Sequence, residues 1–105
     1  MIIDFKNLTP NVVANMRNGE GSVKLVKYAD DVNTIVRITI SKGSSIGWHI
    51  HEADQEIIYV ISGKGVCIED DKEYELVQGQ ANYCKKGKNH SIRNINDEDL
   101  ELQTN

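Results

Sequence analysis

The sequence is poor in the residues that mark several protein classes. Its 105 residues include one proline and two cysteines, and 12 basic side chains are outnumbered by 16 acidic ones. A single proline excludes a proline-rich linker or a collagen-like chain. The formal net charge of -4 offers no basic surface of the kind that nucleic acids bind. We therefore expect no nucleic-acid partner.

Long apolar runs are also absent. The longest wholly apolar run is Ile57–Ile61, whereas a helix that crosses a bilayer needs about 20 residues. Near the N-terminus, Asp4 and Lys6 interrupt the apolar stretch that a secretory signal requires. We expect a cytoplasmic protein with no membrane partner. In that reducing compartment, Cys67 and Cys84 are predicted to be free thiols that pack as small buried side chains.

The pattern of the chain is that of many short strands. No segment of helical length keeps a 3.6-residue apolar period, and period-two alternation broken by glycine, asparagine and aspartate recurs. We expect roughly eight or nine strands in one all-β domain over residues 1–105, arranged as a sandwich or barrel. Strands are predicted at 23–28, 34–40, 48–51, 56–61, 66–69, 73–77, 90–95 and 100–103, and a short helical turn at 9–16.

The three histidines and one glutamate carry the chemistry of the sequence. His49 and His51 stand two residues apart in an extended segment, so their side chains share one face. Glu56 opens the next strand among apolar neighbours, where a buried carboxylate needs a positive partner. His90 opens a later strand. Because neutral imidazole is a common ligand of divalent transition metals, these four side chains could converge on a metal ion inside a barrel.

The first part of this pattern resembles a motif of the cupin superfamily. That motif reads G-x5-H-x-H-x3,4-E-x6-G, and residues 43–63 match it at every fixed position with Gly43, His49, His51, Glu56 and Gly63. A match of this length and spacing is far more specific than a lone glycine motif.

The second cupin motif, G-x5-P-x-G-x2-H-x3-N, resembles residues 79–94. Gly79, Gly87, His90 and Asn94 match, and Lys85 stands in place of the proline. Proline fixes φ and lysine does not, so the substitution changes the turn and removes no candidate ligand. We interpret Asn94 as a structural residue that bonds backbone groups near the end of a sheet.

The resemblance implies a small jelly-roll barrel, the double-stranded β-helix of a single cupin domain. It also implies that His49, His51, Glu56 and His90 ligate one divalent transition metal ion. Proteins that resemble this chain most often carry Mn, Fe, Ni or Zn. The expected partner is a small molecule that chelates the metal.

Two functions of different kinds fit these residues. The first is a mononuclear metalloenzyme of dioxygenase or isomerase type, acting on a small oxygenated metabolite through a Lewis-acid or oxygen-activating ion. The second is a non-catalytic binding or sensing module in which the metal anchors a small molecule. The sequence marks no general base beyond the four ligands, so it assigns no catalytic residue.

The strand at 56–61 is apolar on both faces. Ile57, Tyr59 and Ile61 alternate with Ile58 and Val60, a pattern typical of strands that are buried on both sides. A second copy of the chain would cover the outer face, and a twofold-symmetric homodimer is the commonest arrangement. A homodimer is therefore expected.

The turn before His90 has two interpretations. Cys84 could be a redox or substrate-binding thiol at the barrel mouth instead of a buried side chain. Lys85, Lys86 and Lys88 could attract an anionic ligand, or could simply form a solvated turn.

Overall fold

Ten β-strands in two antiparallel sheets make up almost all of the regular structure. The computed structural model describes residues 1–105. The only helices are two 3-10 turns, η1 (Phe5–Asn7) and η2 (Met16–Asn18), and neither has the length or hydropathy that a membrane crossing requires. The strands are β1 (Asn11–Ala14), β2 (Ser22–Ala29), β3 (Thr34–Ile40), β4 (Ser45–Ile50), β5 (Glu56–Ser62), β6 (Lys64–Glu69), β7 (Lys72–Val77), β8 (Ala81–Cys84), β9 (Asn89–Arg93) and β10 (Leu100–Thr104).

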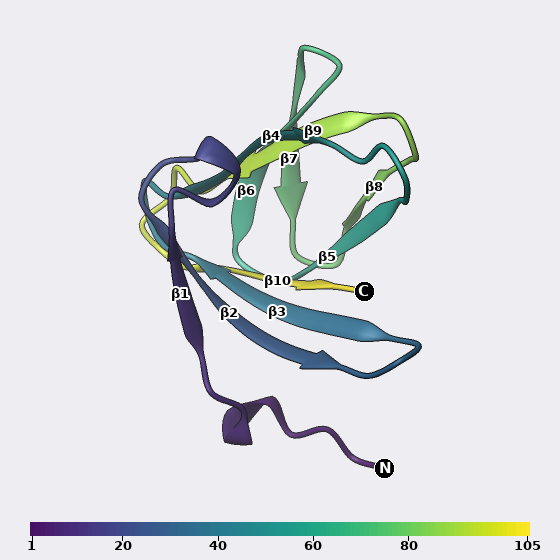
Figure 1. Ribbon diagram of the computed structural model, residues 1–105. Coiled ribbons are helices and arrows are strands. Elements are labelled where there is room, and N and C mark those ends of the chain that lie inside the picture. The colour runs from purple at the N-terminus through teal and green to yellow at the C-terminus, as the bar shows by residue number, and fades with distance from the viewer.

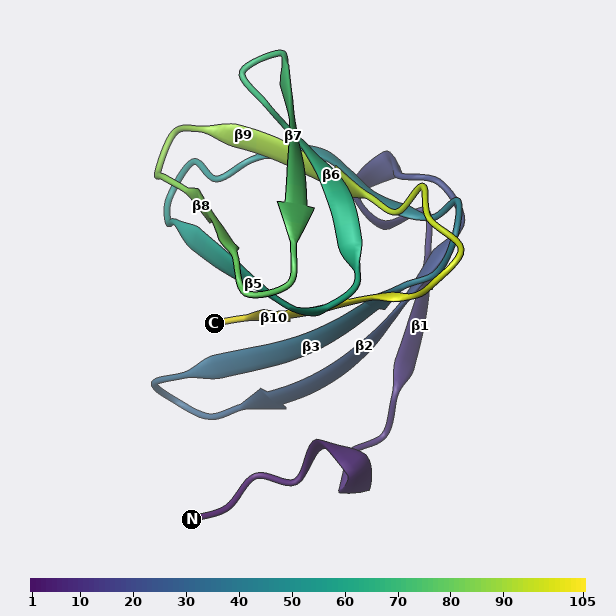
Figure 2. The ribbon, with the colours of Figure 1, turned by 180° about the vertical axis from the view of Figure 1, so that it is seen from behind.

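The two sheets face each other around one interior, as the predicted jelly roll requires. One sheet has the order β1-β2-β3-β10-β5-β8 and the other has the order β4-β9-β6-β7. Figure 1 shows β5 and β8 curving up from the larger sheet toward the smaller one. Seen from behind in Figure 2, the tip of the β6–β7 hairpin projects beyond the barrel, and the N-terminal segment extends from its opposite side. The all-β fold is confirmed.

The core consists of the inward-facing residues of both sheets. In β10, Leu100 and Leu102 lie opposite Ile40 and Ile38 of β3, and all four side chains are buried. Side chains two residues apart in a strand share a face, which is why alternate positions fill the interior. This apolar packing occupies the middle of the barrel and leaves its ends for polar groups.

The N-terminal part of the chain corrects one prediction. The helical turn expected at 9–16 is wrong, because Asn11–Ala14 forms strand β1 and pairs with β2. The β-branched Val12 and Val13 favour extended structure, and Asn15 then leaves the strand in the left-handed conformation. Strand β8 (Ala81–Cys84) was also not predicted. It completes the larger sheet by pairing with β5.

The outer faces of the sheets carry several large apolar side chains. Ile57 and Tyr59 of β5 and Tyr83 of β8 are about half exposed, and Ile57 lies directly opposite Tyr83. Trp48 of β4 is also exposed, and its indole N–H donates a hydrogen bond to Asn89. These side chains face outward, as their strand parity predicts. The homodimer stays a prediction.

Candidate metal centre

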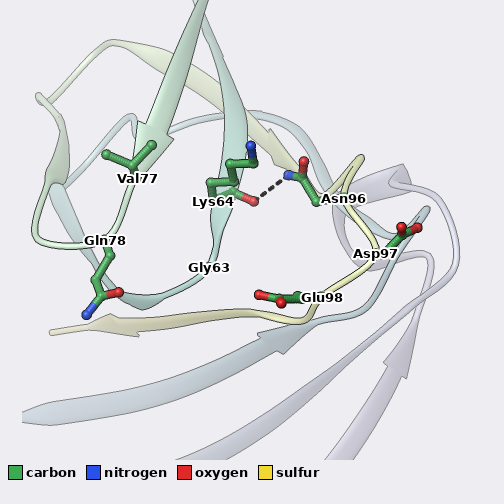
Figure 3. Close-up of a pocket in the computed structure, with 7 residues that line it drawn as sticks. All are labelled: Gly63, Lys64, Val77, Gln78, Asn96, Asp97 and Glu98. Atoms are coloured by element: carbon green, nitrogen blue, oxygen red, sulfur yellow. Dashed lines mark hydrogen bonds between the residues drawn. The ribbon is translucent and has the colours of Figure 1, made fainter.

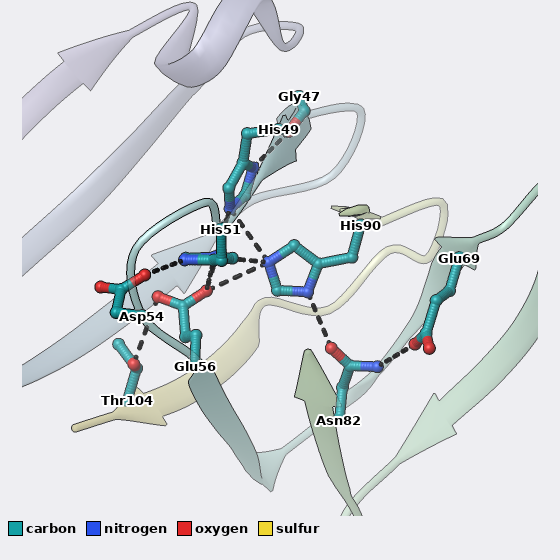
Figure 4. Close-up of polar contacts among 9 residues, drawn as sticks. All are labelled: Gly47, His49, His51, Asp54, Glu56, Glu69, Asn82, His90 and Thr104. Atoms are coloured by element: carbon teal, nitrogen blue, oxygen red, sulfur yellow. Dashed lines mark hydrogen bonds and ion pairs between the residues drawn. The ribbon is translucent and has the colours of Figure 1, made fainter. Parts of the chain in front are cut away.

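The four predicted residues converge at one end of the barrel (Figure 4). His49 lies in β4 directly opposite His90 in β9, and His51 follows the end of β4. Glu56 is the first residue of β5 in the other sheet. One potential ligand atom from each residue lies within 4.8 Å of every other. Both sheets therefore contribute to a single cluster.

The spacing within the cluster fits a metal ion. The three Nε2 atoms are separated by 3.1 Å (His49 to His51), 3.3 Å (His51 to His90) and 2.9 Å (His90 to His49). Oε1 of Glu56 lies 3.1 Å from Nε2 of His90, 3.2 Å from that of His51 and 3.9 Å from that of His49. Two ligand atoms held about 2.1 Å from one ion are about 3.0 Å apart at right angles and about 3.4 Å apart in a tetrahedron. Most of the distances between the donor atoms therefore match those expected around a single metal ion.

Each imidazole has a partner on the side that faces away from the cluster. Nδ1 of His49 lies 2.8 Å from the carbonyl oxygen of Gly47, Nδ1 of His51 lies 3.0 Å from Oδ1 of Asp54, and Nδ1 of His90 lies 2.8 Å from Oδ1 of Asn82. In the neutral rings Nδ1 is then the donor, and the lone pair of Nε2 points into the cluster. Three lone pairs and a carboxylate cannot satisfy one another, so the arrangement fits a cation.

An irregularity in strand β4 places the acceptor for His49. The β4–β9 register shifts between Ile46 and His49, where β4 holds one extra residue. Gly47 lies in this bulge against the η2 segment, and a Cβ there would lie 2.0 Å from the carbonyl oxygen of Arg17. Only glycine permits that approach. The close packing of η2 on β4 thereby fixes the carbonyl that orients His49.

Burial differs among the four residues. The His90 side chain is completely buried, those of His49 and His51 are about one-tenth exposed, and that of Glu56 is 23% exposed. Burial raises the pKa of the Glu56 carboxyl, whereas the imidazoles lower it when they are protonated and no metal is bound, His49 and His90 by hydrogen bonds and His90 and His51 by positive charge. The lowering prevails, and the pKa of Glu56 lies well below its ordinary value. The cluster therefore presents an ionised carboxylate.

The turn before β9 is attached directly to His51. The N–H of His51 donates to the carbonyl oxygen of Lys88 at 3.1 Å, and the N–H of Gly87 donates to the carbonyl oxygen of His51 at 2.6 Å. Gly87 adopts φ +83°, which suits glycine. These bonds hold the turn although Lys85 replaces the proline of the motif. Lys88 approaches Asp70 at 3.8 Å, and Lys85 lies over the Tyr83 ring.

The two cysteines are buried free thiols, as predicted. Burial raises the pKa of Cys67 to about 12 and that of Cys84 to about 11, and the charge of Glu69 adds to both shifts. Because the thiolate is the reactive form, these values argue against the alternative of a redox or substrate-binding thiol at Cys84.

The cavities of the chain lie away from the cluster. The largest, of about 540 Å³, is lined by Gly63, Lys64, Val77, Gln78, Asn96, Asp97 and Glu98 (Figure 3). It lies where β5 and β9 end, whereas Glu56 and His90 lie where the same strands begin. None of the four cavities is lined by a residue of the cluster.

Sequence reasoning missed the residues that support the histidines. Asp54 lies in the loop between β4 and β5, and Asn82 lies in the unpredicted strand β8. Both occupy variable positions of the two motifs, so the motifs do not mark them. The Gly47 contact uses a backbone oxygen, which has no signature in the side-chain pattern. Side chains of β8 alternate between the two faces of the sheet, with Asn82 inward and Tyr83 outward. This alternation was the one feature of the sequence that could have placed Asn82 in the interior.

Comparison with known proteins places this chain among cupin-type structures. The family described as "Cupin domain" matches residues 36–104. The "Oxalate-binding protein" of Thermotoga maritima is 31% identical over 108 residues, covering 97% of this chain and 89% of that protein.

Solved structures agree with this placement. The crystal structure of a predicted oxalate decarboxylase from Thermotoga maritima superposes with a TM-score of 0.94 at 30% identity, covering 99% of this chain and 96% of that one. A polyketide cyclase from Streptomyces resistomycificus superposes with a TM-score of 0.83 at 17% identity, covering 99% of this chain and 76% of that one. The second likeness concerns the fold alone.

Proposed function

The chain belongs to the cupin family, and from this premise we propose that it binds a small dicarboxylate, with oxalate as the first candidate, through one divalent transition metal ion. The observation that carries the proposal is the convergence of three Nε2 lone pairs and the Glu56 carboxylate within 4.8 Å. His49, His51, Glu56 and His90 would hold the ion. A metal bound by four protein ligands keeps coordination positions open when it prefers six.

The surroundings of the cluster favour a small, oxygen-rich chelator. The four potential ligand atoms lie within 4.8 Å of one another, and no side chain of the cluster is more than 23% exposed, so a small chelator can approach an ion held among them more easily than a bulky one. A short dicarboxylate offers two hard oxygen donors to one ion, the ligand type that Mn and related ions accept. The name of the Thermotoga maritima relative, which concerns oxalate, points to the same class of ligand.

The polar groups around the cluster are already bonded to the four residues, which favours binding over turnover. Asp54 and Asn82 bond the outer nitrogens of His51 and His90, and Thr104 donates to Oε2 of Glu56 at 3.4 Å. Each of these groups holds a ligand in place. Cys84 is buried, and its pKa is raised to about 11. The chain thus offers no free general base beside the cluster, and the binding module is preferred to the dioxygenase or isomerase.

Calorimetric titration of metal-loaded protein with oxalate tests this proposal, with acetate as the monocarboxylate control. We expect one oxalate per bound ion, a micromolar dissociation constant, and much weaker binding of acetate. The absence of oxalate binding to protein that carries a full equivalent of metal would contradict the proposal. Release of carbon dioxide or uptake of oxygen during incubation with oxalate would show that the protein is an enzyme and not a binding module.

A further inference from the structure

A chain of polar contacts leads from His90 away from the metal centre and across to the β6–β7 hairpin. Nδ1 of His90 lies 2.8 Å from Oδ1 of Asn82, and Nδ2 of Asn82 donates to Oε2 of Glu69 at 3.0 Å (Figure 4). His90 is in β9, Asn82 in β8 and Glu69 at the end of β6. The chain therefore connects the two sheets at the end of the barrel that holds the cluster.

Glu69 determines which way the amide of Asn82 faces. A carboxylate only accepts hydrogen bonds, so the group that faces Glu69 must be the amide nitrogen of Asn82. The amide oxygen is then directed at His90. Since that oxygen also only accepts, Nδ1 of His90 must carry the proton. The lone pair of His90 Nε2 is left facing His49, His51 and Glu56.

The other two histidines do not need such a second partner. His49 is bonded to the Gly47 carbonyl and His51 to the Asp54 carboxylate, and both of these are acceptors in every orientation. An asparagine amide is not, because rotation by half a turn would present its N–H groups to Nδ1. Nε2 would then carry the proton and point it at the cation. His90 is completely buried, so water cannot replace the missing acceptor.

We infer that Asn82 and Glu69 are positioning residues of the metal centre: Glu69 orients Asn82, which holds His90 in the tautomer whose Nε2 can ligate. This inference rests on the metal site of the proposed function and is independent of the proposed dicarboxylate. Groups that orient metal-bound histidines typically contribute about 10- to 100-fold to metal affinity.

Two measurements test the inference. Nitrogen NMR of the metal-free protein reports which ring nitrogen of His90 carries the proton, and competition with a chelator gives the affinity for Ni²⁺. We expect the Nδ1-protonated ring in the unsubstituted protein. In Asn82→Ala and in Glu69→Ala we expect a mixture of tautomers and Ni²⁺ binding weakened by about 10- to 100-fold. Asn96→Ala, which removes an asparagine contact to the Lys64 carbonyl at the other end of the barrel, should change neither.

A rescue experiment separates positioning from a general loss of structure. The carboxylate of Asn82→Asp accepts hydrogen bonds in both orientations, so it no longer needs Glu69. The double variant Asn82→Asp, Glu69→Ala should therefore recover the tautomer and most of the affinity lost in Glu69→Ala. Unchanged tautomer and affinity in Glu69→Ala, or failure of the rescue, would overturn the inference. If the unsubstituted protein binds no Ni²⁺, the proposed function fails, and the tautomer measurement still decides the role of Asn82 and Glu69.

Discussion

Nε2 of His90 and Oε1 of Glu56 lie 3.1 Å apart although their strands, β9 and β5, belong to different sheets. The fold brings the two atoms together at one end of the barrel, next to the Nε2 atoms of His49 and His51. A cation bound there is held by both sheets at once. Metal binding should therefore stabilise the fold, because a ligand that binds only the folded state shifts the unfolding equilibrium.

Metal affinity should fall as the pH falls from 8 to 5. Imidazole ligates a metal only in its neutral form, and the pKa of a free histidine side chain is about 6.5. Below that pH, each histidine that is protonated in the metal-free protein should weaken binding by roughly tenfold per pH unit. Chelator competition at several pH values, corrected for protonation of the chelator, measures this slope. Constant affinity over the whole range would be incompatible with ligation by three histidines.

Gly63 should be far less replaceable than Gly79. Both adopt a positive φ, +83° and +88°, but a Cβ on Gly63 would lie 2.5 Å from the Asp99 carbonyl oxygen, whereas a Cβ on Gly79 meets nothing within 4 Å. Gly79→Ala should lower the free energy of unfolding by about 1–2 kcal/mol through backbone strain alone. Gly63→Ala should lose a further 1–3 kcal/mol or so from the steric conflict. Urea denaturation of both variants checks the difference, and equal losses would refute the steric explanation.

Asn94 should support stability and not metal binding. Its amide nitrogen donates to the carbonyl oxygens of Ile40 and Glu98, both at 2.8 Å, and its amide oxygen accepts from the N–H of Asn96. The side chain is fully buried, so Asn94→Ala should lower the free energy of unfolding by about 2–4 kcal/mol. The folded variant should bind metal with unchanged affinity. A large loss of affinity in the folded variant would mean that Asn94 acts on the metal centre.

The buried thiols should make the metal-free protein sensitive to alkali. The pKa values of Cys67 and Cys84 are raised from 9.0 to about 12 and about 11. The unfolded chain therefore loses these protons first as the pH rises. The stability that this difference provides is complete below pH 9 and is lost as the pH rises through 11 to 12. Unfolding free energies between pH 8 and 11 should fall less steeply in Cys67→Ala, Cys84→Ala than in the unsubstituted protein. Identical slopes would show that the thiols do not titrate in this way.

The sequence could predict that the three histidines and Glu56 face inward, because strand parity and motif spacing are read directly from the order of the residues. His49 and His51 share a face by their spacing, and Glu56 begins a strand whose other inward residues are apolar. The core positions Ile38 and Ile40 follow from the same alternation. These predictions do not depend on which strands are neighbours in the sheets.

The remaining features depend on contacts between distant segments. Asn82 reaches His90 only because β8 pairs with β5 at the edge of the larger sheet. Gly47 offers its carbonyl to His49 because a bulge and the packing of η2 displace the backbone of β4. Thr9 and Pro10 resemble a helix start, which is why a helical turn is predicted at 9–16, but Asn11–Ala14 pairs with β2 and forms strand β1. Tertiary contacts decide these features, and a single sequence does not display them.

The most direct test of the account is the amount of metal that the protein holds. Metal-stripped protein is dialysed against Ni²⁺ or Mn²⁺ and analysed by mass spectrometry, together with His90→Ala and the control Asn96→Ala. We predict one ion per chain in the unsubstituted protein and in Asn96→Ala, and almost none in His90→Ala. Full occupancy in His90→Ala, or no bound metal in the unsubstituted protein, would contradict it.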